Sequence, residues 1–218
     1  TGAATFNITA AIPAGGTNPA NGSQNQEMIW LGGTSQYTSC ADKLTNGNTV
    51  IVWCDYTTYN PYFRIIDSND ATVVADTLIT NSATYTPDGV KHIGVCAYTS
   101  GGFLVYWTGP SGYLCWAVYT NTGTVTAAAT RDTAVVMRTN YNYHISAYAN
   151  PNNNNIVLSF INNGNNLYYA FFSNTGTKGT STALTASAVY QSAWEVCCST
   201  GGYLSLIHIS EPTRRYAI

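Results

Sequence analysis

The sequence has very few charged residues. Asp, Glu, Lys and Arg make up 8% of its 218 residues, against about 25% in an ordinary soluble domain. The formal net charge is −2, so the chain has no basic field to hold nucleic acid or an anionic membrane surface. No stretch reaches the roughly 18–20 apolar residues that a membrane-spanning helix requires. The sequence therefore predicts no nucleic-acid partner and no membrane span.

Motifs of metal, cofactor and nucleophile chemistry are also missing. The chain contains no Cys-x-x-Cys pair, which argues against a zinc site. It contains no Gly-x-Ser-x-Gly elbow, which argues against a serine nucleophile. We therefore expect no metal, no cofactor and no catalytic constellation.

Thr, Asn, Gly, Tyr and Ser dominate the composition instead, with 19 Gly and 17 Tyr. Thr, Asn and Gly are poor helix formers, whereas Thr and Tyr favour strands. The composition therefore indicates an all-β protein.

The chain repeats with a period of about 53 residues. Two positions recur at a spacing of 53 or 54 residues, and each is occupied by a large apolar side chain. They are Trp53, Trp107 and Phe160, and Ile66, Tyr119 and Phe172. A fourth repeat begins near Trp194, because VCCSTGGYL in that region is similar to VCAYTSGGFL in the second repeat. Repeats of this length are typical of stacked architectures.

Each repeat predicts four short strands separated by turn residues. The first strand is recognised in two repeats, at 92–97 and 144–149, and the second strand in three, at 49–53, 103–107 and 156–160. The third strand is expected at 62–66, 114–119 and 167–172. A weaker fourth strand is expected around 76–80, 126–130 and 181–185. The third strand ends in a TNTGT or SNTGT turn, where Gly supplies the left-handed residue.

The second and third strands read as continuous apolar runs without alternation. An antiparallel sheet with one wet face would alternate, so these sheets are expected to be covered on both faces. Four-stranded antiparallel sheets stacked against similar sheets are β-propeller blades. We predict three such blades and a partial fourth, with a β-sandwich of the same strands as the alternative fold.

The pattern GGFLVYW…GYLCWAVYTNTGT resembles the repeats of secreted microbial β-propeller proteins, and the resemblance covers residues 37–203. It implies an extracellular protein, or one on a cell or virion surface, of a kind that includes adhesins, lectin-like modules, phage fibres and carbohydrate-active enzymes. The chain lacks the S-x-D-x-G-x-T-W box of sialidase-like propellers, and its loops are rich in Asn rather than acidic.

The repeats divide the chain into unequal parts. Residues 1–36 are expected to form an N-terminal strand and a Gly/Asn/Pro-rich linker. The blades are expected at about 37–90, 91–142 and 143–189, with a partial one at 190–203. The stretch LSLIHISEPTR at 204–214 resembles the translated read-through of a sequencing adapter. We therefore expect residues 204–218 to be an artefact and the chain to be a truncated fragment, and no function is assigned to this stretch.

Six cysteines allow fifteen disulfide connectivities. Cys40, Cys96 and Cys197 occupy matching positions of the repeat as we align it, which favours small buried pockets over bridges. We therefore expect mostly buried free thiols, and a bridge between the neighbouring Cys197 and Cys198 remains open.

His92 and His144 open matching strands, either as ordinary strand-start residues or as residues lining a central channel. Asp55 and Asp67 are the least turn-like acidic residues. They are the candidates for general acid or base chemistry, which requires two converging carboxylates.

Tyrosines in polar loops are the strongest indication of binding. Exposed Tyr beside Asn, Ser and Gly is typical of surfaces that combine rigid rings with adaptable hydrogen bonds. The predicted ligand-binding residues are Tyr56, Tyr59, Tyr62, Tyr113, Tyr141 and Tyr143.

Three functions follow as hypotheses. The first is a non-catalytic surface module that binds carbohydrate or protein, and the second is a fragment of a carbohydrate-active hydrolase or lyase. The third is a structural repeat of a fibre or surface layer, with self-association through open blade edges.

Overall fold

The computed structural model describes residues 36–55, 58–79, 93–137, 145–164, 166–184, 195–198 and 204–207. All of them belong to one unit, Thr34–Ile218. The predicted N-terminal strand and linker, His92 and His144 lie outside the described residues. So do residues 208–218, whereas 204–207 of the adapter-like stretch form a strand.

Three four-stranded antiparallel sheets make up most of the described structure. The first sheet contains β1 (Gln36–Lys43), β2 (Thr49–Asp55), β3 (Pro61–Ile66) and β4 (Thr72–Leu78). The second contains β5 (Ile93–Ala97), β6 (Phe103–Thr108), β7 (Tyr113–Tyr119) and β8 (Val125–Val136), with a short 3₁₀ turn, η2 (Pro110–Gly112), before β7. The third contains β9 (Ser146–Ala149), β10 (Ile156–Ile161), β11 (Leu167–Phe172) and β12 (Thr182–Ala183). A further pair, β13 (Glu195–Cys198) and β14 (Leu204–Ile207), forms a two-stranded sheet.

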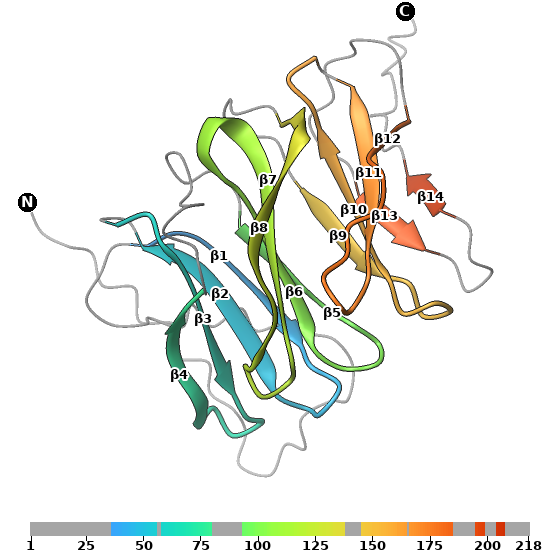
Figure 1. Cartoon of the computed structure of the whole chain (residues 1–218). Helices are drawn as coiled ribbons and strands as arrows, with labels where there is room; N and C mark the ends of the chain where they lie inside the picture. The colour runs from blue at the N-terminus through green and yellow to red at the C-terminus, as the bar shows by residue number, and fades with distance from the viewer. Residues whose placement is uncertain are drawn as a thin grey trace, which may run out of the picture. The chain divides into compact units, whose positions relative to one another are not determined.

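In every four-stranded sheet the strands follow one another in chain order. The first strands of successive sheets lie against each other, since β1 contacts β5, β5 contacts β9, and β9 contacts β13. Figure 1 shows the three sheets side by side along the chain. Strand meanders whose first strands converge are the arrangement of propeller blades. The predicted all-β, propeller-like fold of three blades and a partial fourth is therefore confirmed, in preference to a sandwich.

Two apolar cores lie on either side of the second sheet. Trp107, Phe103 and Val105 pack against the first sheet, and Trp116 and Leu104 pack against the third. Every residue of β6 and all of β7 after Tyr113 are buried. The predicted coverage of both faces of the second and third strands is thus nearly complete in the middle sheet, which alone has a four-stranded neighbour on each side among the described residues.

The turn after the third strand recurs in all three sheets. Its left-handed residue is Asp70 (φ 63°) in the first sheet, Gly123 (φ 78°) in the second and Gly176 (φ 85°) in the third. Asp tolerates this conformation better than most residues. The fourth strand of the first sheet begins at Thr72, two residues after Asp70, as β8 begins two residues after Gly123. The sequence pattern predicted it later, around 76–80, because this turn lacks the Gly that marks the turn in the other two repeats.

Cys54, Cys96 and Cys115 are buried and Cys40 is half-buried, and none of these four forms a disulfide. The side chains of Cys197 and Cys198 lie outside the described structure. The predicted equivalence of Cys40 and Cys96 is wrong. Cys40 lies opposite the residue directly before Trp53, whereas Cys96 lies opposite the third residue before Trp107. The turn between the first two strands, rather than the cysteines, sets the register.

We expect Cys54 and Cys115 to resist alkylation in the folded protein at pH 8. Burial raises the pKa of both thiols to about 12, and the negative charge of Asp55 adds to the effect at Cys54. The thiolate is the nucleophile, so labelling by iodoacetamide is expected to be at least about 100-fold slower than in urea-unfolded protein. Peptide mass spectrometry measures both rates for each cysteine, and equal rates would contradict the burial.

Candidate functional site

The turn that ends β7 docks on the first sheet. Asn121 Nδ2 donates to Thr45 Oγ1 at 2.8 Å, and Asn121 Oδ1 accepts from Gly102 N at 2.7 Å. Gly123 packs so closely on Phe63 and Val74 that a Cβ atom there would lie 3.2 Å and 3.3 Å from their side chains.

The turn that ends β11 repeats this docking on the second sheet, 53 residues later. Asn174 Nδ2 lies 3.4 Å from Ser100 Oγ, and a Cβ atom on Gly176 would overlap with Ala127. Two further bonds join the sheets here: Trp116 Nε1 donates to the carbonyl oxygen of Gly176 at 3.1 Å, and Tyr98 Oη donates to that of Ser173 at 2.8 Å. The sequence repeat is thus also a repeat of contacts between sheets.

Between these two docking turns lies an open pocket of about 420 Å³. It is formed by the turn between β5 and β6, the start of β8, and the turns that follow β7 and β11. Its lining carries no ionisable side chain except the buried Tyr119. The lining residues are Ser100, Gly101, Gly102, Tyr119, Thr120, Asn121, Thr126, Asn174 and Thr175.

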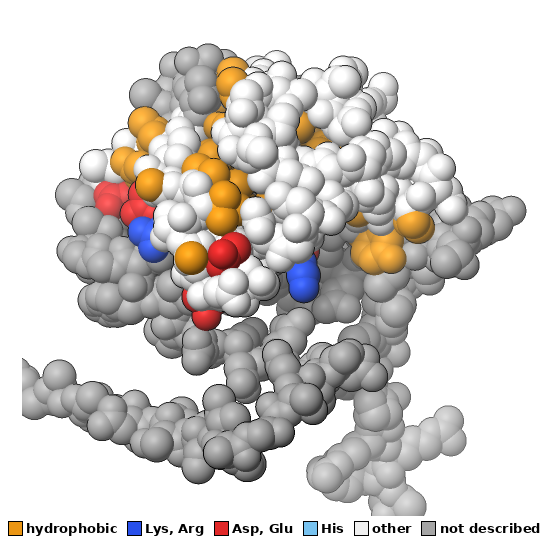
Figure 2. Space-filling view, turned by 90° about the horizontal axis from the view of Figure 1, so that it is seen from below, with side chains coloured by type: hydrophobic (Ala, Val, Ile, Leu, Met, Phe, Trp, Pro, Cys, Tyr) orange, Lys and Arg blue, Asp and Glu red, His pale blue; other side chains and the backbone are white. Residues whose placement is uncertain are grey.

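Hydrogen bonds between the sheets fix one wall of the pocket. Asn154 Oδ1, from the turn between β9 and β10, accepts from Ser100 N at 2.7 Å and from Thr99 Oγ1 at 2.9 Å. Thr120, Thr126, Asn174 and Thr175 are exposed or half-buried. The pocket therefore offers hydroxyl and amide groups on a rigid frame. Figure 2, which views the molecule from below, shows a surface with few charged side chains.

The two carboxylates singled out in the sequence have structural roles in the described structure. Asp55 Oδ1 accepts from Thr58 N at 2.7 Å and from Thr58 Oγ1 at 2.9 Å, which closes the loop after β2. Asp67 Oδ1 accepts from the backbone of Asn69 and Ala71 at 2.8 Å and 2.9 Å. Asp67, which the sequence predicts to be among the least turn-like acidic residues, at the end of the third strand, thus caps the turn before β4.

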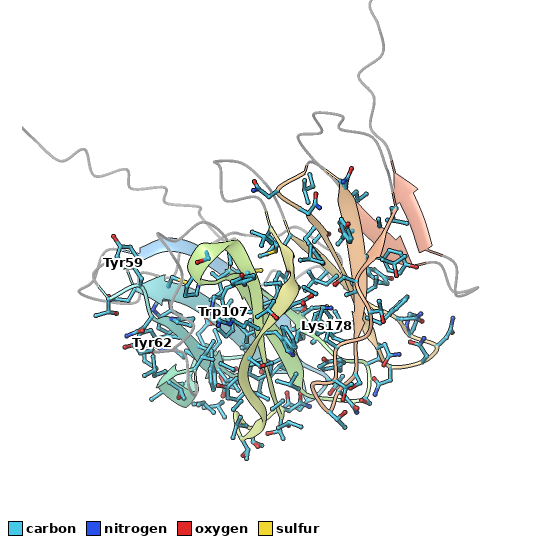
Figure 3. The ribbon with its side chains drawn as sticks, turned by 45° about the horizontal axis from the view of Figure 1, so that its top comes forward. Tyr59, Tyr62, Trp107 and Lys178 are labelled. Carbon is cyan, nitrogen blue, oxygen red and sulfur yellow. The ribbon has the colours of Figure 1, made fainter. Side chains whose placement is uncertain are left out.

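A buried ion pair joins the second and third sheets. Lys178 Nζ lies 2.8 Å from Asp132 Oδ2, and their side chains are 11% and 8% exposed. Ser181 Oγ donates to the same carboxylate oxygen at 3.1 Å, and Ala134 N donates to Oδ1 at 2.8 Å. Burial alone would raise the pKa of Asp132, but these hydrogen bonds and the charge of Lys178 hold it below its usual value. Lys178 is labelled in Figure 3.

Three of the six predicted tyrosines are described, and they lie away from the pocket. Tyr59 is exposed in the loop after β2, and Tyr62 on β3 stacks on Trp53 with ring centroids 5.9 Å apart. Arg131 lies over the ring of Tyr113, 5.3 Å from its centroid. In a meander, the loops between the second and third strands lie at the opposite end of the sheet from the turns that form the pocket. Tyr59 and Tyr62, which belong to such a loop and the strand after it, are labelled in Figure 3. Tyr56, Tyr141 and Tyr143 lie outside the described residues.

The pocket residues carry little signal in the sequence. Their one signal is the recurrence of Asn-Thr-Gly at 121–123 and 174–176, a pattern that predicts a turn but not a binding site. Within the described residues, no three His, Cys, Asp or Glu side chains gather to hold a metal ion, and no helix there is long and apolar enough to cross a membrane.

No protein-family model and no curated protein matches the chain. Among solved structures, a mutant of AofleA from Arthrobotrys oligospora superimposes with a TM-score of 0.54 at 11% identity, over 78% of this chain. This chain spans 48% of that one, about half of its length. A β-1,3-galactosidase of the GH43 family (TM-score 0.45, 12% identity, 72% of this chain and 34% of that one) also matches. So does a mutant of the α-L-arabinofuranosidase Arb93a from Fusarium graminearum, with a TM-score of 0.41 at 13% identity, over 72% of this chain and 50% of that one. The first likeness supports the fold.

Proposed function

We propose that this chain is part of a β-propeller that binds carbohydrate, without catalysis, in the pocket between its second and third sheets. The observation that carries the proposal is the lining: hydroxyl, amide and backbone groups on a frame held by hydrogen bonds between sheets. Sugars are recognised through several hydroxyl groups, and placed polar groups in a preformed site provide that recognition.

The carboxylates of the described residues support binding over hydrolysis. Glycoside hydrolases generally use two carboxyl groups that flank the scissile bond. No Asp or Glu lines the pocket, and Asp55 and Asp132 are engaged by the loop after β2 and by Lys178. A surface or extracellular location belongs to the same proposal, because glycans of cell surfaces are the ligands such a pocket would meet.

Thr175→Val is expected to weaken glycan binding about tenfold, the effect of one or two lost hydrogen bonds. Thr122→Val is the matched control. Thr175 and Thr122 occupy the same position of successive turns, and their hydroxyls make the same local hydrogen bond, to Ser173 at 2.8 Å and to Thr120 at 2.9 Å. Only Thr175 lines the pocket.

A glycan array followed by titration calorimetry on the best ligand measures the effect. Tyr59→Ala is measured in parallel, to test whether the predicted tyrosines bind the ligand instead. If Tyr59→Ala lowers the affinity and Thr175→Val does not, the binding site is at the opposite end of the sheets. Release of reducing sugar from the same ligands would favour the hydrolase hypothesis.

A further inference from the structure

The third sheet has an outer face, turned away from the second sheet. Ile156, Leu158 and Phe172 pack against the second sheet, so the alternating positions on β10 and β11 point the other way. We define the outer face by four residues of β9, β10 and β11, which are Tyr148, Val157, Tyr169 and Phe171. The rings of Tyr169 and Phe171 pack edge to face with their centroids 5.6 Å apart.

This outer face repeats the docking surface of the second sheet. In the third sheet, Tyr148 pairs with Val157 and Val157 with Phe171. The same cross-strand row in the second sheet is Cys96, Leu104 and Val118. There the three residues are 6%, 0% and 1% exposed beneath the third sheet. In the third sheet Val157 is likewise 0% exposed, whereas Tyr148 and Phe171 on either side of it are 36% and 38% exposed.

The opposite end of the stack has different chemistry. On the face of the first sheet turned away from the second, Arg64 Nε lies 2.6 Å from Asp76 Oδ1 in an exposed ion pair. Its equivalent in the second sheet is Ala117, which is fully buried. Burying the ion pair under another sheet would cost desolvation energy. Continuation of the stack is therefore favoured at the third sheet rather than at the first.

The strand β13 continues the stack at this face, whereas β14 lies in the adapter-like stretch and carries no part of the proposal. β13 contacts β9 and β10, as β5 contacts β1 and β2 in the first interface. In both four-stranded interfaces, the third strand of the docking sheet and its Asn-Thr-Gly turn cover the outer half of the sheet beneath. The equivalent outer half of the third sheet carries the exposed Phe171.

We propose that the outer face of the third sheet docks a β-hairpin with a Ser/Thr-Asn-Thr-Gly-Thr turn, which completes the sheet begun by β13. The turn of the docked hairpin contacts Phe171 and Tyr169. These two residues are equivalent to Val118 and Trp116 of the second sheet, which contact the turn after β11. The proposal rests on the repeated contacts and is independent of the carbohydrate site.

The test uses the whole chain and a fluorescent, head-to-tail cyclised hairpin with the sequence of residues 167–183; cyclisation is needed because isolated hairpins are only marginally stable. Fluorescence anisotropy is expected to show saturable binding. Phe171→Lys and Tyr169→Lys are each expected to weaken it at least tenfold. Val125→Lys is the matched control, because Val125 is an equally exposed apolar strand residue (43%) outside this face.

A hairpin with Asn174→Ala and Gly176→Val is expected not to bind, since it lacks the docking groups. Circular dichroism of each variant confirms that the sheets are intact. Absence of saturable binding, or binding that is indifferent to Phe171, overturns the proposal. It is also overturned if sedimentation shows a Phe171-dependent dimer that excludes the hairpin, because a second copy of the chain is then the occupant.

Discussion

Gly176→Ala is expected to lower the free energy of unfolding by about 3 kcal/mol. At φ 85° an L side chain adds about 1–2 kcal/mol of backbone strain. The new Cβ atom would also overlap with the Cβ of Ala127, which is part of a strand and cannot rotate away; forced overpacking adds about 1–3 kcal/mol. Urea unfolding followed by tryptophan fluorescence measures the change.

Gly47→Ala is the matched control for the backbone term. Gly47 has nearly the same φ, 87°, but nothing lies within 4 Å of the place that a Cβ atom would take, so about 1–2 kcal/mol of strain is expected there and no overlap. Adding Ala127→Gly to Gly176→Ala should recover the overlap term alone, which a double-mutant cycle isolates. Equal losses at Gly176 and Gly47 would show that the turn does not dock closely on the second sheet.

The strands that could be predicted well are those whose burial leaves a local pattern. β6, β7 and β10 are apolar at nearly every position, because sheets cover them on both sides, and they begin and end within one residue of the predicted bounds. β12 is only two residues long and β4 begins early, because fourth strands lie at the exposed edge and carry no such pattern. Propensity alone sets few boundaries there.

The candidate site could not be predicted, because it depends on how sheets lie against each other. Ser100 and Asn174 are 74 residues apart and meet only through the docking of the third sheet on the second. The tyrosines were singled out by composition, which does not indicate at which end of a strand a pocket forms. Asp132 and Lys178 form a buried pair but have no local signal either, because they are 46 residues apart in the sequence.

Lys178→Met is expected to destabilise the folded protein by about 3 kcal/mol at pH 7. The substitution keeps the length of the side chain but leaves the carboxylate of Asp132 buried without its cation, which is the costly way to break a buried pair. The matched control is Arg64→Met, which breaks the exposed Arg64–Asp76 pair (25% and 43% exposed) and is expected to cost less than about 1 kcal/mol.

The pH dependence of this loss has a definite sign. In the folded wild type the pKa of Asp132 is held below the ordinary value of 3.8. Its contribution to stability is therefore complete above that value and is lost as the pH falls through the lower, folded pKa. In Lys178→Met the burial that remains raises the pKa of Asp132, so the carboxyl takes up a proton more readily and the penalty shrinks on acidification.

Urea unfolding of the wild type and of Lys178→Met between pH 3 and pH 7 is therefore expected to give curves that converge at the acid end. The double variant Asp132→Leu with Lys178→Met should recover most of the loss at pH 7, since matched apolar groups replace a buried pair at little cost. A loss that stays constant with pH, or one no larger than that of Arg64→Met, would mean that the pair is solvated and does not lock the second sheet to the third.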